Sequence, residues 1–381
     1  MIYFDNAATS FPKPLSVLRE ITKCIKSYCG NPGRGAHSLS RVSSEKVYTA
    51  REEIASLFGS DKPENVFFTY NDTYALNMVI KGLLQKGDHV LISDMEHNSV
   101  YRPIAVMAEK GLIEFDIFDS MCLSWGQNGE GICEGIKKLI KPNTKMLIAA
   151  HASNICSAVL PICEIGALCR SLGIIFVLDG AQSAGHIPIS MERDNIDVLC
   201  APGHKGLYGL QGSGFVILGD GIMPNPIIEG GSGVNSLDIH MPELSPERFE
   251  AGTVSVPCAI ALCEGIKFVR ERGMEEIHEH ECTLFCRAFD MLSSFENVTI
   301  YAPMHIGSVL LFNVDSVPSE RLSAMLDGCG ICTRGGYHCS PLGHRTLGTP
   351  AGGAVRLSFS PFNTMRELET FYSSMKSIVR A

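Results

Sequence analysis

The chain has 381 residues, of which 45% are hydrophobic and 19% are charged, and its formal net charge is −9. This composition is typical of a well-buried globular protein and excludes a disordered chain. The acidic balance, with no run of Lys and Arg, argues against a nucleic-acid partner. A chain of this length is too long for one small core, so we expect two lobes.

The N-terminal residues MIYFDNAATS show no charged leader before an apolar core, and no apolar stretch approaches the roughly 20 residues that cross a bilayer. We therefore expect a cytoplasmic protein without a membrane anchor. The 15 cysteines are an odd number, which favours small buried side chains over a set of disulfides. Cys332 and Cys339, seven residues apart with His338 beside the second, make a weak metal site, so no metal is expected.

Short apolar runs alternate with helix-length segments through the first part of the chain. The predicted strands are Asn65–Thr69, His89–Ser93, Met146–Ala150, Ile174–Asp179, Val198–Ala201 and Gly214–Leu218. Predicted helices between them include Tyr74–Gln85 and Ile165–Leu172. This alternation predicts a large α/β lobe, residues 15–256, with a mostly parallel sheet flanked by helices.

After about Pro257 the pattern changes. A long helical stretch, Ala259–Arg272, continues towards Leu292. The later predicted elements are the strands Val298–Tyr301, Ser308–Val314 and Ala354–Ser358 and the helices Glu320–Leu326 and Met365–Val379. These elements predict a smaller α+β lobe, made of residues 1–14 and 257–381.

Polar side chains follow four of the predicted strands. His97, Asn154 and Lys205 come shortly after three of them, and Asp179 ends a fourth. Ligands of parallel sheets sit at the carboxyl ends of the strands, so we expect the functional site at this edge.

Lys205 lies in the glycine-rich loop APGHKGLYG, and Asp179 ends the apolar run of FVLDGAQSAGH. A desolvated lysine has a lowered pKa and can attack a carbonyl, although a solvated turn lysine fits the same loop. A carboxylate at the end of a buried strand either caps the next turn or pairs with a protonated ring nitrogen, as a pyridoxal phosphate site requires.

The segment FTYNDTYALN ends a strand and opens a helix. Asn71, Asp72 and Thr73 form a cluster of helix-capping residues there, and a helix N-terminus with a hydroxyl also suits a phosphate. A carboxylate repels a phosphate, so Asp72 must point away or the site is weaker.

Cys339 lies in RGGYHCSPLGH, beside His338 and near Arg334. This loop is typical of an accessible thiolate with a low pKa rather than a core cysteine. Downstream, Arg356 alternates with apolar residues on a predicted strand. Its guanidinium needs a partner, which is either a substrate carboxylate or an internal ion pair.

The whole set of motifs resembles the class V aminotransferases among the fold-type I pyridoxal-phosphate enzymes, and within them the cysteine desulfurases and selenocysteine lyases. The resemblance runs nearly end to end, through YFDNAATSFPKP, NPGRGAHSLS, DMEHNSVYRP, HASN, DGAQSAGH, PGHKGLYGLQGSG, FEAGTVSVP, RGGYHC and VRLSFSPFNT.

The resemblance implies a role for each matching residue. Lys205 would hold pyridoxal 5′-phosphate covalently and move the substrate proton, Asp179 would pair with the ring nitrogen, and His97 would stack on the ring. Further cofactor contacts would come from Asn154, Gln182, Asp72, Thr73, His204 and, from the neighbouring subunit of a homodimer, Thr253.

The substrate side of the site follows in the same way. Arg356 would hold the substrate carboxylate, and Cys339 would attack its sulfur. Arg334 and the segment that contains Asn6 and Ala7 would assist in binding. Two departures put phosphate affinity in doubt, because Pro202 replaces a serine of many relatives and Asn71-Asp72-Thr73 replaces Gly-Thr-Thr.

The reaction expected from these residues is removal of sulfur from L-cysteine, which leaves L-alanine and a persulfide on Cys339. A sulfur-acceptor protein would then be a partner. The same machinery would serve L-selenocysteine, and a class V aminotransferase acting on another small amino acid needs the lysine but no loop cysteine. A degenerate family member retained as a sulfur-carrier scaffold is the non-enzymatic alternative.

Overall fold

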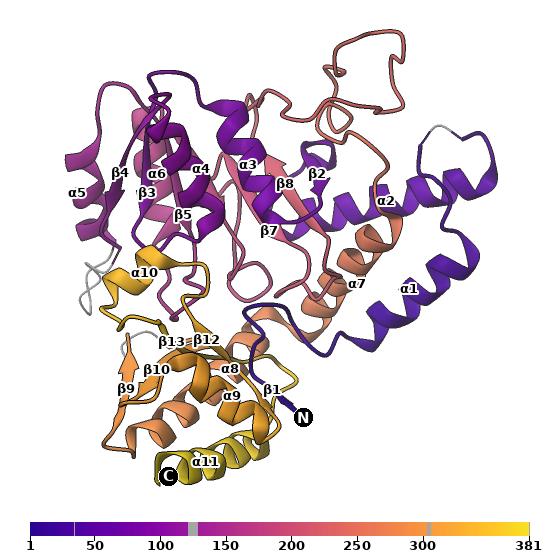
Figure 1. Ribbon diagram of the computed structural model, residues 1–381. Helices are drawn as coiled ribbons and strands as arrows, with labels where there is room; N and C mark the ends of the chain where they lie inside the picture. Colours follow the sequence, from indigo (N-terminus) through magenta and orange to yellow (C-terminus); the bar gives the residue numbers. More distant parts are fainter. Residues whose placement is uncertain (34, 121–128, 303–305, 381) are drawn as a thin grey trace.

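The computed structural model describes residues 1–33, 35–120, 129–302 and 306–380, and Figure 1 shows a large lobe above a smaller one that holds both chain ends. The elements of the large lobe and the connecting helix are α1 (Leu15–Ser27), α2 (Ser38–Leu57), η1 (Pro63–Asn65), β2 (Val66–Thr69), α3 (Asp72–Leu83), β3 (His89–Ser93), α4 (Asn98–Glu109), β4 (Glu114–Phe118), α5 (Glu130–Leu139), β5 (Thr144–Ala150), α6 (Ile162–Leu172), β6 (Ile175–Asp179), β7 (Val198–Pro202), β8 (Gly214–Leu218) and α7 (Val256–Arg272).

A mostly parallel sheet forms the centre of the large lobe. Its strand order is β2-β8-β7-β6-β5-β3-β4, and β8 runs antiparallel to both of its neighbours. The remaining pairs, from β7 across to β4, are parallel. The predicted α/β fold with a mostly parallel sheet is therefore confirmed.

Helices cover both faces of this sheet, which explains why its strands are continuous apolar runs. In β6, Leu178 packs into the cluster that includes residues of α2, α5, α6 and α7. The preceding Val177 points to the opposite face and packs with residues of α3 and α4. The carboxyl ends of the parallel strands face the small lobe, where their loops remain free to carry polar side chains.

The small lobe is built on a four-stranded antiparallel sheet of order β12-β13-β10-β9. Its elements are β1 (Ile2–Tyr3), α8 (Met274–Ser293), β9 (Val298–Tyr301), β10 (Val309–Val314), α9 (Ser319–Gly328), β11 (Ile331–Cys332), β12 (Arg334–Gly336), α10 (Pro341–Thr346), β13 (Ala354–Ser358) and α11 (Met365–Arg380). The N-terminal strand β1 pairs with β11, and Phe4 enters the core beside Phe359 and Phe371. The strand β1 and Phe4 therefore pack with elements of the small lobe, while the assignment of all of residues 1–14 stays a prediction.

The single helical stretch predicted from Ala259 towards Leu292 is wrong in one respect. The structure divides it into α7 and α8 at Gly273, whose φ is +87°. A left-handed residue cannot continue a helix, and glycine adopts that conformation without a steric penalty. Leu262 and Ile266 of α7 pack into the core of the large sheet. The predicted lobe boundary at residue 257 stays a prediction.

Across the described ranges, the helices are too short or too polar to pass through a lipid bilayer.

Candidate active site

Four strand ends bring their polar side chains around one cavity of about 170 Å³. His97 follows β3, Asn154 follows β5, Asp179 ends β6 and Lys205 follows β7. These strands are neighbours in the sheet, so residues more than 100 positions apart in sequence share one lining. The rest of the predicted cofactor set that lines this cavity is Asp72, Thr73, Gln182 and His204.

Lys205 and Asp179 are oppositely charged groups in a site without much water. Burial lowers the pKa of Lys205, and the Asp179 carboxylate opposes that shift. Burial also raises the pKa of Asp179, against the backbone amide of Ala181, which donates to its Oδ1 at 2.8 Å, and the charge of Lys205. A lysine with a lowered pKa is one that can lose its proton and act as a nucleophile or base.

His97 is held as the N-cap of α4. Its Nδ1 accepts the backbone N–H of Ser99 at 3.1 Å and faces the Ser99 hydroxyl at 2.8 Å. Burial, followed by the charges of Lys205, Arg334 and Arg356, lowers the pKa of His97 to about 4. The ring is therefore a neutral aromatic surface at physiological pH.

One end of the cavity is suited to an anion. Asn71 caps α3 by accepting the Tyr74 amide at 2.9 Å, and the first residues of the helix, Asp72 and Thr73, line the cavity. His204 lies beside them, and its buried Nδ1 has no hydrogen-bond partner among the described residues. At Gly214, a Cβ would lie 3.1 Å from the Asp72 amide, so only glycine lets β8 approach this turn so closely.

Asp72 does not point away from this site. Its side chain is 8% exposed and lines the same cavity as Asp179 and Lys205. Burial, followed by the charge of the neighbouring Asp179 carboxylate, raises the pKa of Asp72 well above its usual range.

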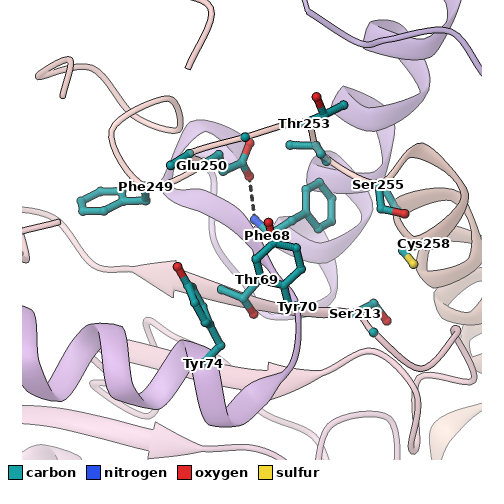
Figure 2. A pocket seen from close by; sticks show the side chains of 15 residues that line it. Phe68, Thr69, Tyr70, Tyr74, Ser213, Phe249, Glu250, Thr253, Ser255 and Cys258 are labelled. Carbon is teal, nitrogen blue, oxygen red and sulfur yellow. Dashed lines mark hydrogen bonds between the residues drawn. The ribbon is translucent and has the colours of Figure 1, made fainter. Parts of the chain in front are cut away.

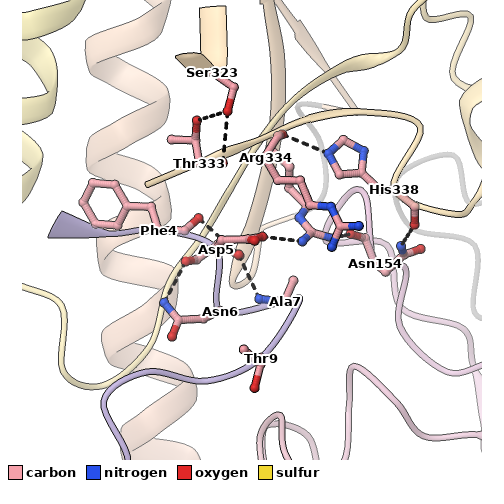
Figure 3. A network of polar contacts seen from close by, with 12 residues as sticks. Phe4, Asp5, Asn6, Ala7, Thr9, Asn154, Ser323, Thr333, Arg334 and His338 are labelled. Atoms are coloured by element: carbon pink, nitrogen blue, oxygen red, sulfur yellow. Dashed lines mark hydrogen bonds and ion pairs between the residues drawn. The ribbon is translucent and has the colours of Figure 1, made fainter. Parts of the chain in front are cut away.

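Figure 3 shows a network of polar contacts around Asp5, Asn154 and Arg334. Arg356 of β13 bonds to two residues of this network. Its Nη1 donates to the carbonyl of Asn154 at 2.9 Å, and its Nη2 pairs with Asp5 at 2.6 Å. The internal ion pair, one of the two alternatives for this arginine, is thus present. The buried Nε has no partner among the described residues.

The N-terminal segment is anchored at the same place. Asn6 donates to the Ser358 carbonyl at 3.0 Å, and the Ala7 amide donates to the Ser358 hydroxyl at 2.9 Å. Gln182 of the large lobe donates to the carbonyl of Ala7 at 3.0 Å. Arg334 lies directly opposite Arg356 in the pairing of β12 with β13, with its side chain exposed.

Cys339 lies on an exposed loop at the rim of the site. It lines a groove of about 780 Å³ together with Thr73, His97 and Ser99, and these three residues also line the Lys205 cavity. The two spaces are therefore adjacent. The structure brings the predicted nucleophile and the predicted lysine to the two sides of His97.

The loop that carries Cys339 is tied down on both sides. His338 and Cys339 have φ values of +52° and +58°, a left-handed conformation that non-glycine residues rarely adopt. The Asn98 amide donates to the Cys339 carbonyl at 2.7 Å, and Asn154 donates to the His338 carbonyl at 2.8 Å. These bonds from the large lobe hold a backbone that would otherwise relax.

The sequence analysis did not predict that His338 and His344 stack on each other beside this loop. His338 Nε2 contacts the Arg334 carbonyl at 3.0 Å, and its Nδ1 contacts His344 Nε2 at 3.1 Å. His344 Nδ1 in turn contacts the Thr349 hydroxyl at 2.8 Å. When both rings are neutral, each of these contacts can have one donor and one acceptor. The motif HCSPLGH contains both histidines, but only the tight turn at α10 stacks them.

This histidine pair predicts an acid-sensitive fold. Burial lowers the pKa of His338 from 6.5 to about 3, so the unfolded chain binds the proton first as the pH falls. The free energy of unfolding then drops below pH 6.5, and at pH 5 the share of His338 is about 2 kcal/mol. Urea unfolding at pH 7.5 and pH 5 measures this loss.

His338→Gln is expected to reduce the difference between the two pH values, and His240→Gln, at an exposed histidine, is expected to leave it unchanged. An undiminished pH dependence in His338→Gln would show that His338 is not the group that titrates.

Glu96 is a second buried group that the sequence analysis did not select. Its Oε1 accepts the Ser93 hydroxyl at 2.5 Å and the Ala150 amide at 2.8 Å. Burial raises the pKa of Glu96 to about 8. It joins β3 to β5 behind the cavity. In the sequence, only its position next to His97 could have indicated that it lies near the site.

Thr253 lies outside the Lys205 cavity. It lines a neighbouring pocket with Tyr70, Tyr74 and Glu250, where Glu250 accepts the Phe68 amide at 2.6 Å (Figure 2). A role for Thr253 from a second subunit stays a prediction. Over the described part of the chain, no cluster of three or more His, Cys, Asp or Glu side chains could hold a metal ion.

Comparison with known proteins settles the family. The family model "Aminotransferase class-V" matches residues 2–371. The chain belongs to the class V aminotransferase family. Among the curated members, a probable cysteine desulfurase of Methanothermobacter thermautotrophicus is 30% identical over 99% of this chain and 94% of its own. The cysteine desulfurase of Haloferax volcanii is 32% identical over 97% of this chain and 87% of its own.

A solved structure of the family agrees with this assignment. The apo structure of the cysteine desulfurase from Thermococcus onnurineus NA1 superposes with a TM-score of 0.90 and 32% identity. The match covers 100% of this chain and 94% of that one. The resemblance of this class V chain to the cysteine desulfurases is thereby confirmed.

Proposed function

We propose that the protein is a pyridoxal-phosphate-dependent cysteine desulfurase, which converts L-cysteine to L-alanine and keeps the sulfur on Cys339 as a persulfide. The observation that carries this proposal is the position of Cys339, across His97 from the Lys205 cavity. A class V transaminase would need the lysine alone. An accessible thiol next to the substrate space is what sulfur transfer requires.

The residues of the cavity fit pyridoxal phosphate. The unpartnered Nδ1 of His204 and the first-turn amides of α3 supply donors for a phosphate. Asp179 supplies a carboxylate for the ring nitrogen, and neutral His97 supplies an aromatic face. When bound, the cofactor acts as an electron sink that weakens the bonds at the substrate Cα.

Lys205 is the residue proposed to hold the cofactor and to move the substrate proton. Burial lowers the pKa of its amine, so the amine is available to take a proton at neutral pH. Asp179 is close enough to oppose this shift, which keeps the pKa from falling further. The same carboxylate can therefore serve the lysine and the ring nitrogen.

The substrate carboxylate is proposed to bind between the two arginines of β12 and β13. The Nε of Arg356 is buried and unpartnered among the described residues, while Asp5 fixes the rest of its guanidinium. Arg334, opposite Arg356 on the paired strand, presents a second cation. Two guanidinium groups on neighbouring strands favour a carboxylate at the rim of the cavity.

Sulfur transfer is proposed to proceed by attack of the Cys339 thiolate on the sulfur of the substrate. A new S–S bond forms, the substrate Cβ–S bond breaks, and its electron pair stays on Cβ, which then takes a proton to give alanine. Cys339 is oxidised to the persulfide level as the substrate carbon is reduced. The substrate thus supplies both the sulfur and the oxidant.

A sulfur acceptor is proposed to reach Cys339 along the groove between α3 and α4. Lys81, Lys86, Arg102 and Lys110 line this groove, and its described lining includes no Asp or Glu. In a chain of net charge −9, this local positive surface favours an acidic acceptor protein. Dithiothreitol added from solution should strip the sulfur from loaded Cys339, and a persulfide that resists this thiol would contradict the open route.

A homodimer is proposed from the surface near Thr253. A groove of about 1040 Å³ separates the segment around His37 from the loop that contains Leu244. Leu237 and Ile239 on that loop are more than 90% exposed, which is unusual for aliphatic side chains of a monomer. Light scattering should give twice the mass of one chain, and a monomer at micromolar concentration would contradict the proposal.

The proposed activity is tested with the purified protein, pyridoxal phosphate and L-cysteine. We expect a bound-cofactor absorbance band, L-alanine as the product and one added sulfur atom on the protein by intact mass. Alanine formed without the added sulfur would indicate a desulfurase that does not use Cys339. Amino transfer to a keto acid without alanine would show that the protein is a transaminase.

A further inference from the structure

Two buried carboxyl groups line the Lys205 cavity. Asp72 is the first residue of α3 and is 8% exposed, and Asp179 ends β6 and is 2% exposed. Both side chains line the same cavity, and the charge of Asp179 raises the pKa of Asp72. The Oδ1 of Asp72 is buried and has no donor among the described residues.

The sheet explains how residues 107 positions apart meet. Asp179 lies beside Cys200 in the pairing of β6 with β7, and Pro202 lies beside Gly214 in the pairing of β7 with β8. The first turn of α3 rests on Gly214, with the Asp72 amide 3.1 Å from the position of a Cβ there. Asp72 begins α3 above β8, and β8 is two strands away from β6, which ends at Asp179. Both residues therefore lie near the face of the sheet that α3 covers.

Two buried carboxylates in one cavity repel each other, so a close contact between them requires a proton. Among the described residues that line the cavity, Lys205 is the one cation. The other titratable groups around the pair do not supply a charge, since His97 and His204 have pKa values lowered to about 4 and Glu96 has a pKa raised to about 8. One cation cannot balance two buried carboxylates.

We propose that Asp72 is a positioning residue which carries a proton at neutral pH and donates it to the carboxylate of Asp179. This contact restrains the Asp179 carboxylate, which is proposed to face the ring nitrogen of the cofactor. The part played by the ring nitrogen rests on the proposed function. The shared proton does not depend on that function.

The shared proton also removes the conflict between Asp72 and a phosphate. A neutral carboxylic acid does not repel an anion at the N-terminus of α3, whereas a carboxylate would. The amides of the first turn then bind phosphate although a carboxyl side chain replaces a hydroxyl there. Of the two carboxyls, Asp179 is the one that stays ionised, because the Ala181 amide donates to it.

Infrared difference spectroscopy of the holoprotein tests the proton directly. Wild type minus Asp72→Asn at pH 7.5 should show the C=O stretch of a protonated carboxylic acid, and the band should shift in heavy water. Glu96→Gln is the matched control, because Glu96 is the other buried acid and its band must be assigned separately. Absence of an Asp72 band would overturn the proposal. If Asp72→Asn does not fold, Asp72→Thr replaces it in the same measurement.

Cofactor affinity supplies the second readout. Asn is the same shape as the neutral acid and can donate to Asp179, so apoprotein with Asp72→Asn should bind pyridoxal phosphate within about threefold of wild type. If Asp72 were ionised, its removal would relieve repulsion and tighten binding by about tenfold or more, which would overturn the proposal. A protein that holds the proton but releases no sulfur from cysteine would refute the proposed function and leave this inference standing.

Discussion

Replacing Lys205 by alanine is expected to abolish alanine formation, with a loss in turnover of at least about a thousandfold. Lys205 is the residue proposed both to hold the cofactor and to move the substrate proton, so one substitution removes two functions. The protein should also lose its cofactor absorbance on gel filtration, because only non-covalent contacts remain. Turnover and the absorbance of the eluted protein are the two measurements.

Lys13 offers the matched control for this prediction. Burial lowers the pKa of Lys13 to about 8, and its Nζ donates to the His204 carbonyl at 2.8 Å. A second lysine with a lowered pKa therefore contacts His204, the residue that precedes Lys205 in the chain. Borohydride reduction followed by peptide mass analysis should place the cofactor on Lys205, and Lys13→Met should keep it. Label on Lys13 would refute the role given to Lys205.

Replacing Cys339 by alanine is expected to reduce sulfur release by at least about a hundredfold while the bound cofactor remains. Cys339 lines the groove and not the cavity, so its removal leaves every proposed cofactor contact in place. The absorbance band and the affinity for L-cysteine should therefore stay close to wild type. Sulfide assay, alanine assay and the absorbance spectrum separate the two effects.

Cys329→Ala controls for the loss of an exposed thiol, because Cys329 is also exposed and lies outside the groove. It should retain full sulfur release and still gain one sulfur atom on Cys339. Full sulfide production by Cys339→Ala would show that another group accepts the sulfur, and the persulfide step would have to be abandoned.

The sequence analysis located the strands with apolar sequences well and missed strands whose sequences are polar or very short. The strand ranges His89–Ser93, Gly214–Leu218, Val298–Tyr301 and Ala354–Ser358 agree with the structure residue for residue. The edge strand β4 was not predicted, because its sequence EFDIF carries polar residues and is half-exposed. The position of β4 is set by its pairing with β3, and the residues of β4 do not reveal that neighbour.

The chain's own residues determined the kind of chemistry. A lysine among glycines, an aspartate at the end of an apolar strand and a cysteine in a Gly/Pro loop are readable because each residue type departs from its local background. Strand periodicity was enough to place all four polar strand ends on one sheet edge. Such signals are local, and they require no knowledge of what lies opposite.

Only the tertiary structure decided which groups face each other and so what charge each one carries. The ion pair of Arg356 with Asp5, the stacking of His338 on His344 and the contact of Asp72 with Asp179 all join segments that the sheets and turns bring together. Protonation depends on burial and on the distance to neighbouring charges, and both arise only when the chain is packed.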